Sequence, residues 1–386
     1  MNNKLEPELL EFLRQAVAGG AAECYCALSE AAQQKLLEQI KEQKLMPLAG
    51  YFLSAHLPAE TAEKSVMLYR KNSIRMLKMQ VEFKNLCQLL SGYSIRFAPF
   101  KGMDLAYRCY PAPALRYLND WDILIHPDDC SKALEVLAQN GWSTRETLNL
   151  NTLHHHYVQH FKNDVCLEPH RTFAQFGQVA PRDLWEHITP VAPGSFQHVL
   201  SAELNLLQLT CHAASWLYSH QKTVKLLLDA AYLLKKEPVD WIKLKKLARQ
   251  WNLPYPGNLL SAYPEFFAPE LLHSMQGDAE AAAAFRQLAE SDFEQTNVDA
   301  GEFDLNDERG GLARGVRRGF NRFTAQALRR KYHLPERGAY LRLSVLAMWD
   351  LMIKFCRFCK YLLMPDKKLK ARRKLIKTAE AVKNEK

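Results

Sequence analysis

The sequence predicts an α+β protein in which a mixed sheet is flanked by helical regions on its N-terminal and C-terminal sides. Three features of the chain carry this prediction. Residues 5–92 place apolar side chains three and four positions apart, the spacing of helices that pack on a core. Short β-branched and aromatic runs replace this pattern between 94 and 173, and the helical spacing returns from about Ser201.

The composition is that of a folded protein long enough for more than one core. The chain has 386 residues, of which 48% are hydrophobic and 24% charged, whereas disordered chains are poorer in apolar residues. We predict an N-terminal helical region (1–92), an α+β core (93–195), a helical domain (196–275), an acidic linker or loop (276–312) and a basic helical C-terminal region (313–386).

The first half of the α+β core is predicted to run strand, helix, strand. The stretch SIRFAPF (94–100) has the length and composition of a strand. The helix that follows begins near Lys101 and stops at Pro111, because proline cannot continue a helix. WDILI (121–125) is the second strand.

The second half of the core is predicted as one helix and three strands. Asp128 or Asp129 can cap the helix SKALEVLAQN, which closes at Gly141. Extended stretches follow in WSTRETLNL, HHHYVQHF and DVCLEPHRTF. This order of elements predicts a compact α+β unit with a mixed sheet.

Two acids, Asp120 and Asp122, stand one residue apart at the start of the second strand. Side chains alternate along a strand, so both carboxylates project from one face. Close carboxylates repel each other unless a cation lies between them, and carboxylate oxygens favour Mg²⁺. Glu168, on the same face of a later strand as Cys166 and His170, is the third acid predicted for this metal site.

A phosphate-binding site is predicted at the junction of the first strand and its helix. A helix N-terminus offers backbone N–H groups and a positive dipole end, and Gly102 permits close backbone approach. Lys101 adds a full positive charge, and Arg116 supplies a planar fork that suits phosphate oxygens.

These residues, in the runs FAPFKGMDLAYRCYPAPALRYLNDWDILIHPDD, GW and VCLEPHRTF, resemble a known family. It is the uncharacterised nucleotidyltransferase family of the DNA polymerase beta superfamily. Its pattern is Lys-Gly, a Tyr-containing helix, Arg-x-x-x-Asp-x-Asp before apolar residues, and a later Glu-x-His strand. The resemblance extends over residues 30–255.

The resemblance implies a polymerase-beta-like core that transfers a nucleoside monophosphate from an NTP such as ATP to an acceptor hydroxyl, releasing pyrophosphate. Two Mg²⁺ ions would be held by Asp120 and Asp122. Glu168 would ligate the ion that activates the acceptor or serve as the base. The triphosphate would be held by Lys101, Gly102 and Arg116.

Two other functions stay open at this point. One is a non-catalytic nucleotide- or phosphate-binding interaction module, and the other is a phosphotransferase (kinase) on the same fold. An intact trio of acids, Asp120, Asp122 and Glu168, favours the enzyme over the binding module. Transfer of a nucleotide and transfer of a phosphoryl group differ only in which phosphorus is attacked.

Histidines supply the candidate substrate contacts. In the triple-histidine run that ends at His156, neighbouring side chains alternate in direction, so a strand face or a wall of the acceptor pocket is favoured over zinc. His170 orients Glu168, contacts substrate or is a buried imidazole. His212 and Asp229 lie on apolar helices, where a buried polar contact is expected first and a substrate contact second.

Charge is distributed unevenly along the chain. The net charge is +9, and from Arg314 onward 21 Lys and Arg stand against 5 Asp and Glu, which leaves −7 for residues 1–313. This asymmetry predicts an anionic partner for the basic C-terminus, either a membrane surface or nucleic acid, with a solvated helical face as the alternative. Charges throughout the apolar stretch near Cys356 and Cys359 argue against a transmembrane span.

The location is predicted from the N-terminus and the cysteines. The sequence begins without the cationic and apolar segments of a secretory signal, and its nine cysteines are unevenly scattered in apolar segments. Both features favour the cytoplasm, with a peripheral position at the inner membrane face as a further expectation from the basic C-terminus.

Overall fold

The computed structural model describes residues 5–144, 156–173, 179–215, 220–267, 269–275 and 277–289. The chain divides into two units, Met1–Asp292 and Phe293–Lys386, and every described residue lies in the first unit. The predictions for the basic C-terminal region, and for Cys356 and Cys359 within it, therefore fall outside the described residues.

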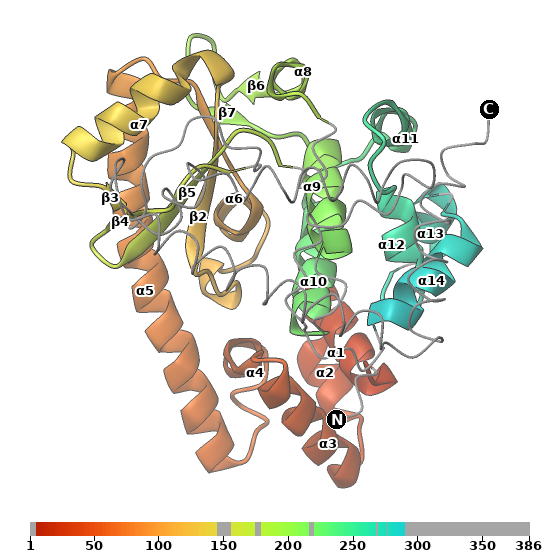
Figure 1. The fold of residues 1–386 in the computed structure, drawn as a ribbon. Helices are drawn as coiled ribbons and strands as arrows, with labels where there is room; N and C mark the ends of the chain where they lie inside the picture. Colours follow the sequence, from red (N-terminus) through yellow and green to blue (C-terminus); the bar gives the residue numbers. More distant parts are fainter. Residues whose placement is uncertain are drawn as a thin grey trace, which may run out of the picture. The chain divides into compact units, whose positions relative to one another are not determined.

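A five-stranded mixed sheet lies within the first unit (Figure 1). The order is β1-β2-β5-β4-β3, in which β2 and β5 are parallel and the other pairs antiparallel. The strands are β1 Phe97–Phe100, β2 Asp120–Ile125, β3 Ser143–Thr144, β4 His160–Lys162 and β5 Val165–His170. With α6 (Lys101–Arg108) and α7 (Cys130–Gln139) between them, they confirm the predicted α+β class, the element order and the mixed sheet.

Helices surround this sheet on both sides in the sequence. Before it come α1 Pro7–Ala18, α2 Ala21–Cys26, α3 Glu30–Glu42, α4 Met46–Phe52 and α5 Ala59–Gly92. After it come α8 Pro181–Trp185, the short strands β6 Thr189–Pro190 and β7 His198–Val199, and then α9 Ala202–Ser215, α10 His220–Lys236, α11 Trp241–Gln250, α12 Pro256–Ser261, α13 Pro269–Met275 and α14 Ala279–Ala289. Two 3₁₀ turns, η1 Pro113–Leu115 and η2 Pro127–Asp129, complete the fold. Across the ranges that the structure describes, no helix has the length and apolar character needed to cross a membrane.

The two faces of the sheet belong to different hydrophobic cores. Trp121 and Ile123 of β2 point into a core shared with α5 and α7, where the ring of Phe83 meets Trp121 edge-on at 5.5 Å. Phe100 and Leu124 point the other way, into a core shared with the remaining helices. The result is a layered arrangement with α5 and α7 on one side of the sheet and α9 and α10 on the other (Figure 1), and α6 contributes buried side chains to both cores.

The first helices and the helical domain form one body, although the sequence presents them as separate regions. Buried side chains of α1, including Leu9 and Phe12, share a core with α9 to α12. The hydroxyl of Tyr232 on α10 donates to the carbonyl oxygen of Ala16, at 3.3 Å. Segments about 200 residues apart thus pack together, because neither can bury its apolar face alone.

Two local predictions need correction. Asp129 stands at the N-cap position of α7, but its carboxylate accepts hydrogen bonds from the backbone and guanidinium of Arg96 instead of capping the helix. A charged donor makes the stronger bond. The linker predicted over 276–312 is wrong for Ala279–Ala289, which form α14: Asp278 accepts from the N–H of Ala281 at 2.6 Å, and Ala282 is buried. Gly141 ends α7 with a φ of 81°, as predicted.

A buried acid, Asp104, joins α6 to the helical body. Arg108 pairs with Asp104 at 2.7 Å and with Glu237, after α10, at 2.8 Å. Burial raises the pKa of the Asp104 carboxyl to about 6, and the nearby charge of Arg108 only partly opposes this effect. Ionised Asp104 is therefore held at a cost in this position.

We expect this cost to appear as a pH dependence of stability. The pKa of Asp104 is higher in the folded chain, about 6, than in an unfolded one, so the folded state binds the extra proton. Its contribution to the free energy of unfolding is therefore most favourable below pH about 4 and falls as the pH rises through 6. Relative to Asp104→Asn, the wild type should lose roughly 2 kcal/mol between pH 4 and 7, measured by urea unfolding. A constant difference between the two proteins would contradict the burial argument.

Candidate active site

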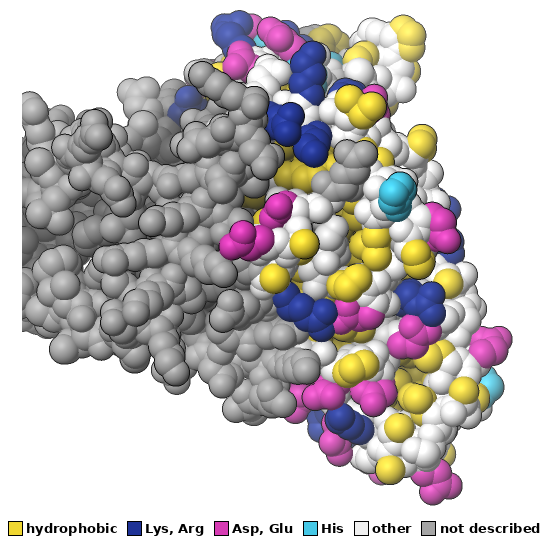
Figure 2. All heavy atoms as spheres, turned by 90° about the vertical axis from the view of Figure 1, so that its right-hand side faces the viewer, with side chains coloured by type: hydrophobic (Ala, Val, Ile, Leu, Met, Phe, Trp, Pro, Cys, Tyr) yellow, Lys and Arg dark blue, Asp and Glu magenta, His cyan; other side chains and the backbone are white. Residues whose placement is uncertain are grey.

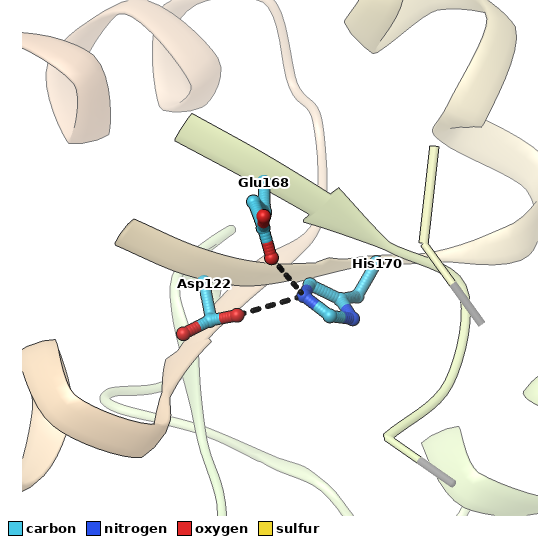
Figure 3. Close-up of side chains that lie close together, drawn as sticks. All are labelled: Asp122, Glu168 and His170. Carbon is cyan, nitrogen blue, oxygen red and sulfur yellow. Dashed lines mark hydrogen bonds and ion pairs between the residues drawn. The ribbon is translucent and has the colours of Figure 1, made fainter. Parts of the chain in front are cut away.

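The parallel pairing of β2 with β5 brings the predicted acids together. Asp122 stands opposite Glu168 in the register, and Asp120 stands opposite Cys166. Alternation then places Asp120, Asp122, Glu168 and His170 on one face of the sheet. Figure 3 shows Asp122, Glu168 and His170 converging from the two strands, and their potential ligand atoms all lie within 4.8 Å of one another.

One oxygen of Asp122 is shared by two donors. The ammonium of Lys101 lies 2.6 Å from Oδ1 of Asp122, and Nε2 of His170 lies 2.8 Å from the same oxygen. Burial opposes ionisation of Asp122, but the charge of Lys101 and the hydrogen bond from His170 outweigh it and hold the pKa well below the usual range. Asp122 is therefore ionised, even though it is only 6% exposed.

The other two acids show how much negative charge gathers here. Burial would raise the pKa of Glu168, but hydrogen bonds from His170 and Gln159 lower it to about 2. Burial raises the pKa of Asp120 to about 6, and the charges of Asp122 and Glu168 add to that rise. The negative charge on this face of the sheet thus exceeds the single positive charge of Lys101.

This donor set fits a divalent cation. Three carboxylates supply the hard oxygen ligands that Mg²⁺ prefers. The raised pKa of Asp120 indicates that added positive charge nearby would stabilise its ionised form. The compact group consists of Asp122, Glu168 and His170, and Asp120 lies outside it. The ligand set Asp120, Asp122 and Glu168 stays a prediction, and the structure adds His170 to the residues that meet there.

His170 is placed to orient these acids. Its ring is fully buried, meets Phe100 edge-on at 4.9 Å, and directs Nε2 toward Asp122 and toward Glu168, which is 3.7 Å away. The geometry therefore favours the orienting role among the three predicted for His170. His156 pairs with it in an isolated bridge, with 5.6 Å between the ring centroids. His212 lies half-buried on α9.

The strand–Lys–Gly–helix order is present as predicted, because β1 ends at Phe100 and α6 begins at Lys101. Lys101 has a φ of 57°, in the left-handed region that side chains other than glycine rarely adopt. Such backbone strain is common where a side chain must be held for function. A Cβ added to Gly102 would lie 2.4 Å from Leu118 and 3.4 Å from Nη2 of Arg116, so glycine lets residues 116–118 pack on the first turn of α6.

Arg116 makes a contact that differs from the predicted one. Its Nε and Nη2 each lie 2.6 Å from an oxygen of Asp229 on α10, and Tyr110 donates to Asp229 at 2.7 Å. Asp229 is fully buried. The fork predicted for phosphate is thus taken by Asp229, which confirms the buried polar contact expected for this acid. Phosphate binding by Arg116 stays a prediction.

Three contacts of the site were not predicted from the sequence: Lys101 with Asp122, Gln159 with Glu168, and Arg116 with Asp229. The pairing of Lys101 with Asp122 and that of Gln159 with Glu168 join different strands or turns, and nothing in the local pattern indicates them. Asp229 did carry a signal, because it is the single acid in the apolar run KLLLDAAYLL and so needs a buried cationic partner.

Comparison with protein-family models matches residues 29–257 to a family described as an uncharacterised nucleotidyltransferase. The match runs from the start of α3 into α12 and so contains the sheet, the acids and Asp229. It agrees with the resemblance over 30–255. No curated protein and no solved structure matches the chain.

We expect the buried Arg116–Asp229 pair to contribute to the free energy of unfolding. Either Arg116→Ala or Asp229→Asn leaves its partner buried and unpaired, so each should lower the free energy of unfolding by about 3–5 kcal/mol. The apolar double variant Arg116→Met/Asp229→Leu should recover much of this loss. Urea unfolding measures all three.

A surface pair provides the control. Arg14 binds Glu11 with side chains 40% and 42% exposed, so Arg14→Ala should cost less than about 1 kcal/mol. If Arg116→Ala costs no more than Arg14→Ala, the buried pair does not have the structural role given to it above.

Proposed function

Because the chain belongs to the uncharacterised nucleotidyltransferase family, we propose that it transfers a nucleoside monophosphate from an NTP to an acceptor hydroxyl. Pyrophosphate is released, and Mg²⁺ is the expected metal. One observation carries the proposal: the parallel register that sets Asp122 opposite Glu168, with Lys101 bound to Asp122 from the start of α6. We infer that the acids bind the metal and that the neighbouring ammonium of Lys101 binds phosphate.

The reaction exchanges a phosphoanhydride bond of the NTP for a phosphate ester bond to the acceptor. The oxygen of the acceptor hydroxyl attacks the α-phosphorus, and the bond from that phosphorus to the oxygen bridging to the β-phosphate breaks. Pyrophosphate leaves with the electron pair, and the hydroxyl proton passes to a base. When bound, Mg²⁺ neutralises charge on the transferred group and on the leaving pyrophosphate.

The acids divide into holding and activating roles. Asp120 and Asp122 would hold the metal, and Glu168 would either complete its ligand set on the acceptor side or take the hydroxyl proton. His170 is a positioning residue, since its hydrogen bond fixes the direction of the Asp122 carboxylate and its ring also approaches Glu168.

Lys101 and the first turn of α6 would hold the triphosphate. Lys101 pairs with Asp122. A metal bound to Asp122 would compete for that oxygen, and the ammonium would then be available for phosphate oxygens a short distance away. Gly102 keeps this turn close to residues 116–118, and the Arg116–Asp229 pair ties those residues to α10. Arg116 thus enters the proposal as a support for the phosphate site.

Transfer of labelled nucleotide tests this function. The protein is incubated with each NTP labelled at the α- or γ-phosphate, Mg²⁺ and a cell extract that supplies acceptors. We expect α-label to be transferred, and we expect Asp120→Ala, Asp122→Ala and Glu168→Ala each to lower the rate at least about a hundredfold.

The matched control is Asp183→Ala, at an exposed acid on α8, which should leave the rate unchanged. Transfer of γ-label in place of α-label would identify a phosphotransferase. NTP binding without any transfer, insensitive to all three acid substitutions, would support the non-catalytic binding module and exclude the metal-site assignment.

A further inference from the structure

The outer face of α5 carries a row of exposed apolar side chains. Met67, Ile74, Leu77 and Val81 are 56%, 58%, 63% and 59% exposed. Their spacing of seven, three and four residues places them along one side of the helix, over about 21 Å at 1.5 Å per residue. Single exposed apolar residues are ordinary on a protein surface, but four along one side of a helix indicate a binding surface.

Cations lie beside this row and, at Arg70, within it. From Lys64 to Lys84 every exposed charged side chain of α5 is basic, and Glu82 is half-buried and bound by Asn163 at 3.2 Å. We define the α5 outer face as the four apolar residues above together with the exposed cations Arg70, Lys71, Lys78 and Lys84.

The inner face of α5 is already committed to the fold. Met76, Met79 and Leu86 are buried in the core beneath the sheet. Asn72 donates to the carbonyl oxygen of Ala114 at 2.5 Å, and the backbone of Met76 accepts from Tyr107. In Figure 1 the helix runs along the edge of the fold, with its first half extending past the sheet. The outer face is therefore held rigidly and contributes nothing to this core.

The chemistry of the face selects its partner. A second copy of α5 would suit the seven-residue spacing, but it would bring Lys71 and Lys78 against the same cations. Nucleic acid would pair with the lysines, but the exposed positions from Met67 to Lys84 include no aromatic ring for stacking on bases. An anionic bilayer suits both the apolar and the basic side chains of this face, because aliphatic side chains enter the acyl boundary while lysines reach lipid phosphates.

We propose that the α5 outer face docks the protein on the surface of an anionic lipid bilayer. The helix lies in the plane of the membrane surface, with Met67, Ile74, Leu77 and Val81 inserted and the four cations at the headgroups. A convex helical ridge fits a soft, flat surface, whereas a protein partner would need a matching groove. The proposal does not rest on the nucleotidyl transfer proposed above.

A second surface with similar chemistry provides the control. A groove of about 700 Å³ is lined by residues of α11 to α13, including Ile242, Lys245, Lys246 and Arg249. Figure 2 shows Lys and Arg side chains beside hydrophobic ones on the face of the molecule that contains these helices. Ile242 is 85% exposed, so this groove also combines cations with an exposed apolar side chain, but it lacks the row of four that defines the α5 outer face.

Sedimentation with lipid vesicles tests the proposal on the full chain. Vesicles of phosphatidylcholine alone are compared with vesicles that also contain phosphatidylglycerol, at low and high salt. We expect binding to the anionic vesicles only, weakened by salt. Because each cation at an anionic surface is worth roughly fivefold in partitioning, Lys71→Gln/Lys78→Gln/Lys84→Gln should lower it on the order of a hundredfold.

The variants separate the two parts of the face. Ile74→Ser/Leu77→Ser/Val81→Ser should lower partitioning at least about tenfold at unchanged charge. The control Ile242→Ser/Lys245→Gln/Lys246→Gln should bind like the wild type. All three variants should keep the circular dichroism spectrum of the wild type and its transfer of α-label in solution, since none touches the site.

Four results would overturn the proposal. In the first, the wild type does not bind anionic vesicles, and in the second, the α11 control loses binding while the α5 variants keep it. In the third, the α5 variants bind like the wild type, but the C-terminal variant Lys367→Gln/Lys368→Gln/Lys370→Gln loses binding. In the fourth, sedimentation velocity shows a dimer that only the α5 serine variant disrupts. The last result would assign the α5 outer face to a second copy of the chain.

Discussion

The repulsion among Asp120, Asp122 and Glu168 is the constraint on which the rest of the site depends. The parallel pairing of β2 and β5 brings these acids together on one face of the sheet, and burial disfavours their ionised forms. Two donors stabilise the carboxylate of Asp122 by binding one of its oxygens. They are Lys101, which has a left-handed backbone conformation, and the buried ring of His170. What they leave unbalanced is the charge that a divalent cation would neutralise.

The surrounding helices keep this group of acids in place. One face of the sheet is sealed by α5 and α7 and carries only apolar side chains from β2, so the polar residues are confined to the other face. There α6 approaches closely because Gly102 has no side chain, and the Arg116–Asp229 pair connects the segment before β2 to α10. The helical regions thus support the site. The family match extends over α3 to α11 and into α12, and leaves out α1, α2, α13 and α14.

Strand alternation explains why the sequence predicts so much of the site. Asp120, Asp122 and Glu168 could be placed on one face from local pattern alone, and the register confirms that Asp122 and Glu168 are opposite. Local pattern could not reveal that Arg116 meets Asp229, 113 residues later, because that contact depends on how α10 packs against the core. The same holds for α1 and α10, whose shared core joins two regions that are separate in sequence. The α14 helix was missed because its acidic flanks resemble a linker.

We propose that Asp122 would exchange Lys101 for a divalent cation when nucleotide binds. A crystal structure with Mn²⁺ and an NTP whose α,β-bridging oxygen is replaced by methylene tests this exchange. We expect anomalous density for Mn²⁺ within about 2.3 Å of carboxylate oxygens of Asp122 and its neighbouring acids, with the Lys101 ammonium on the triphosphate. Mn²⁺ bound elsewhere, with Lys101 still paired to Asp122 beside bound nucleotide, would contradict it.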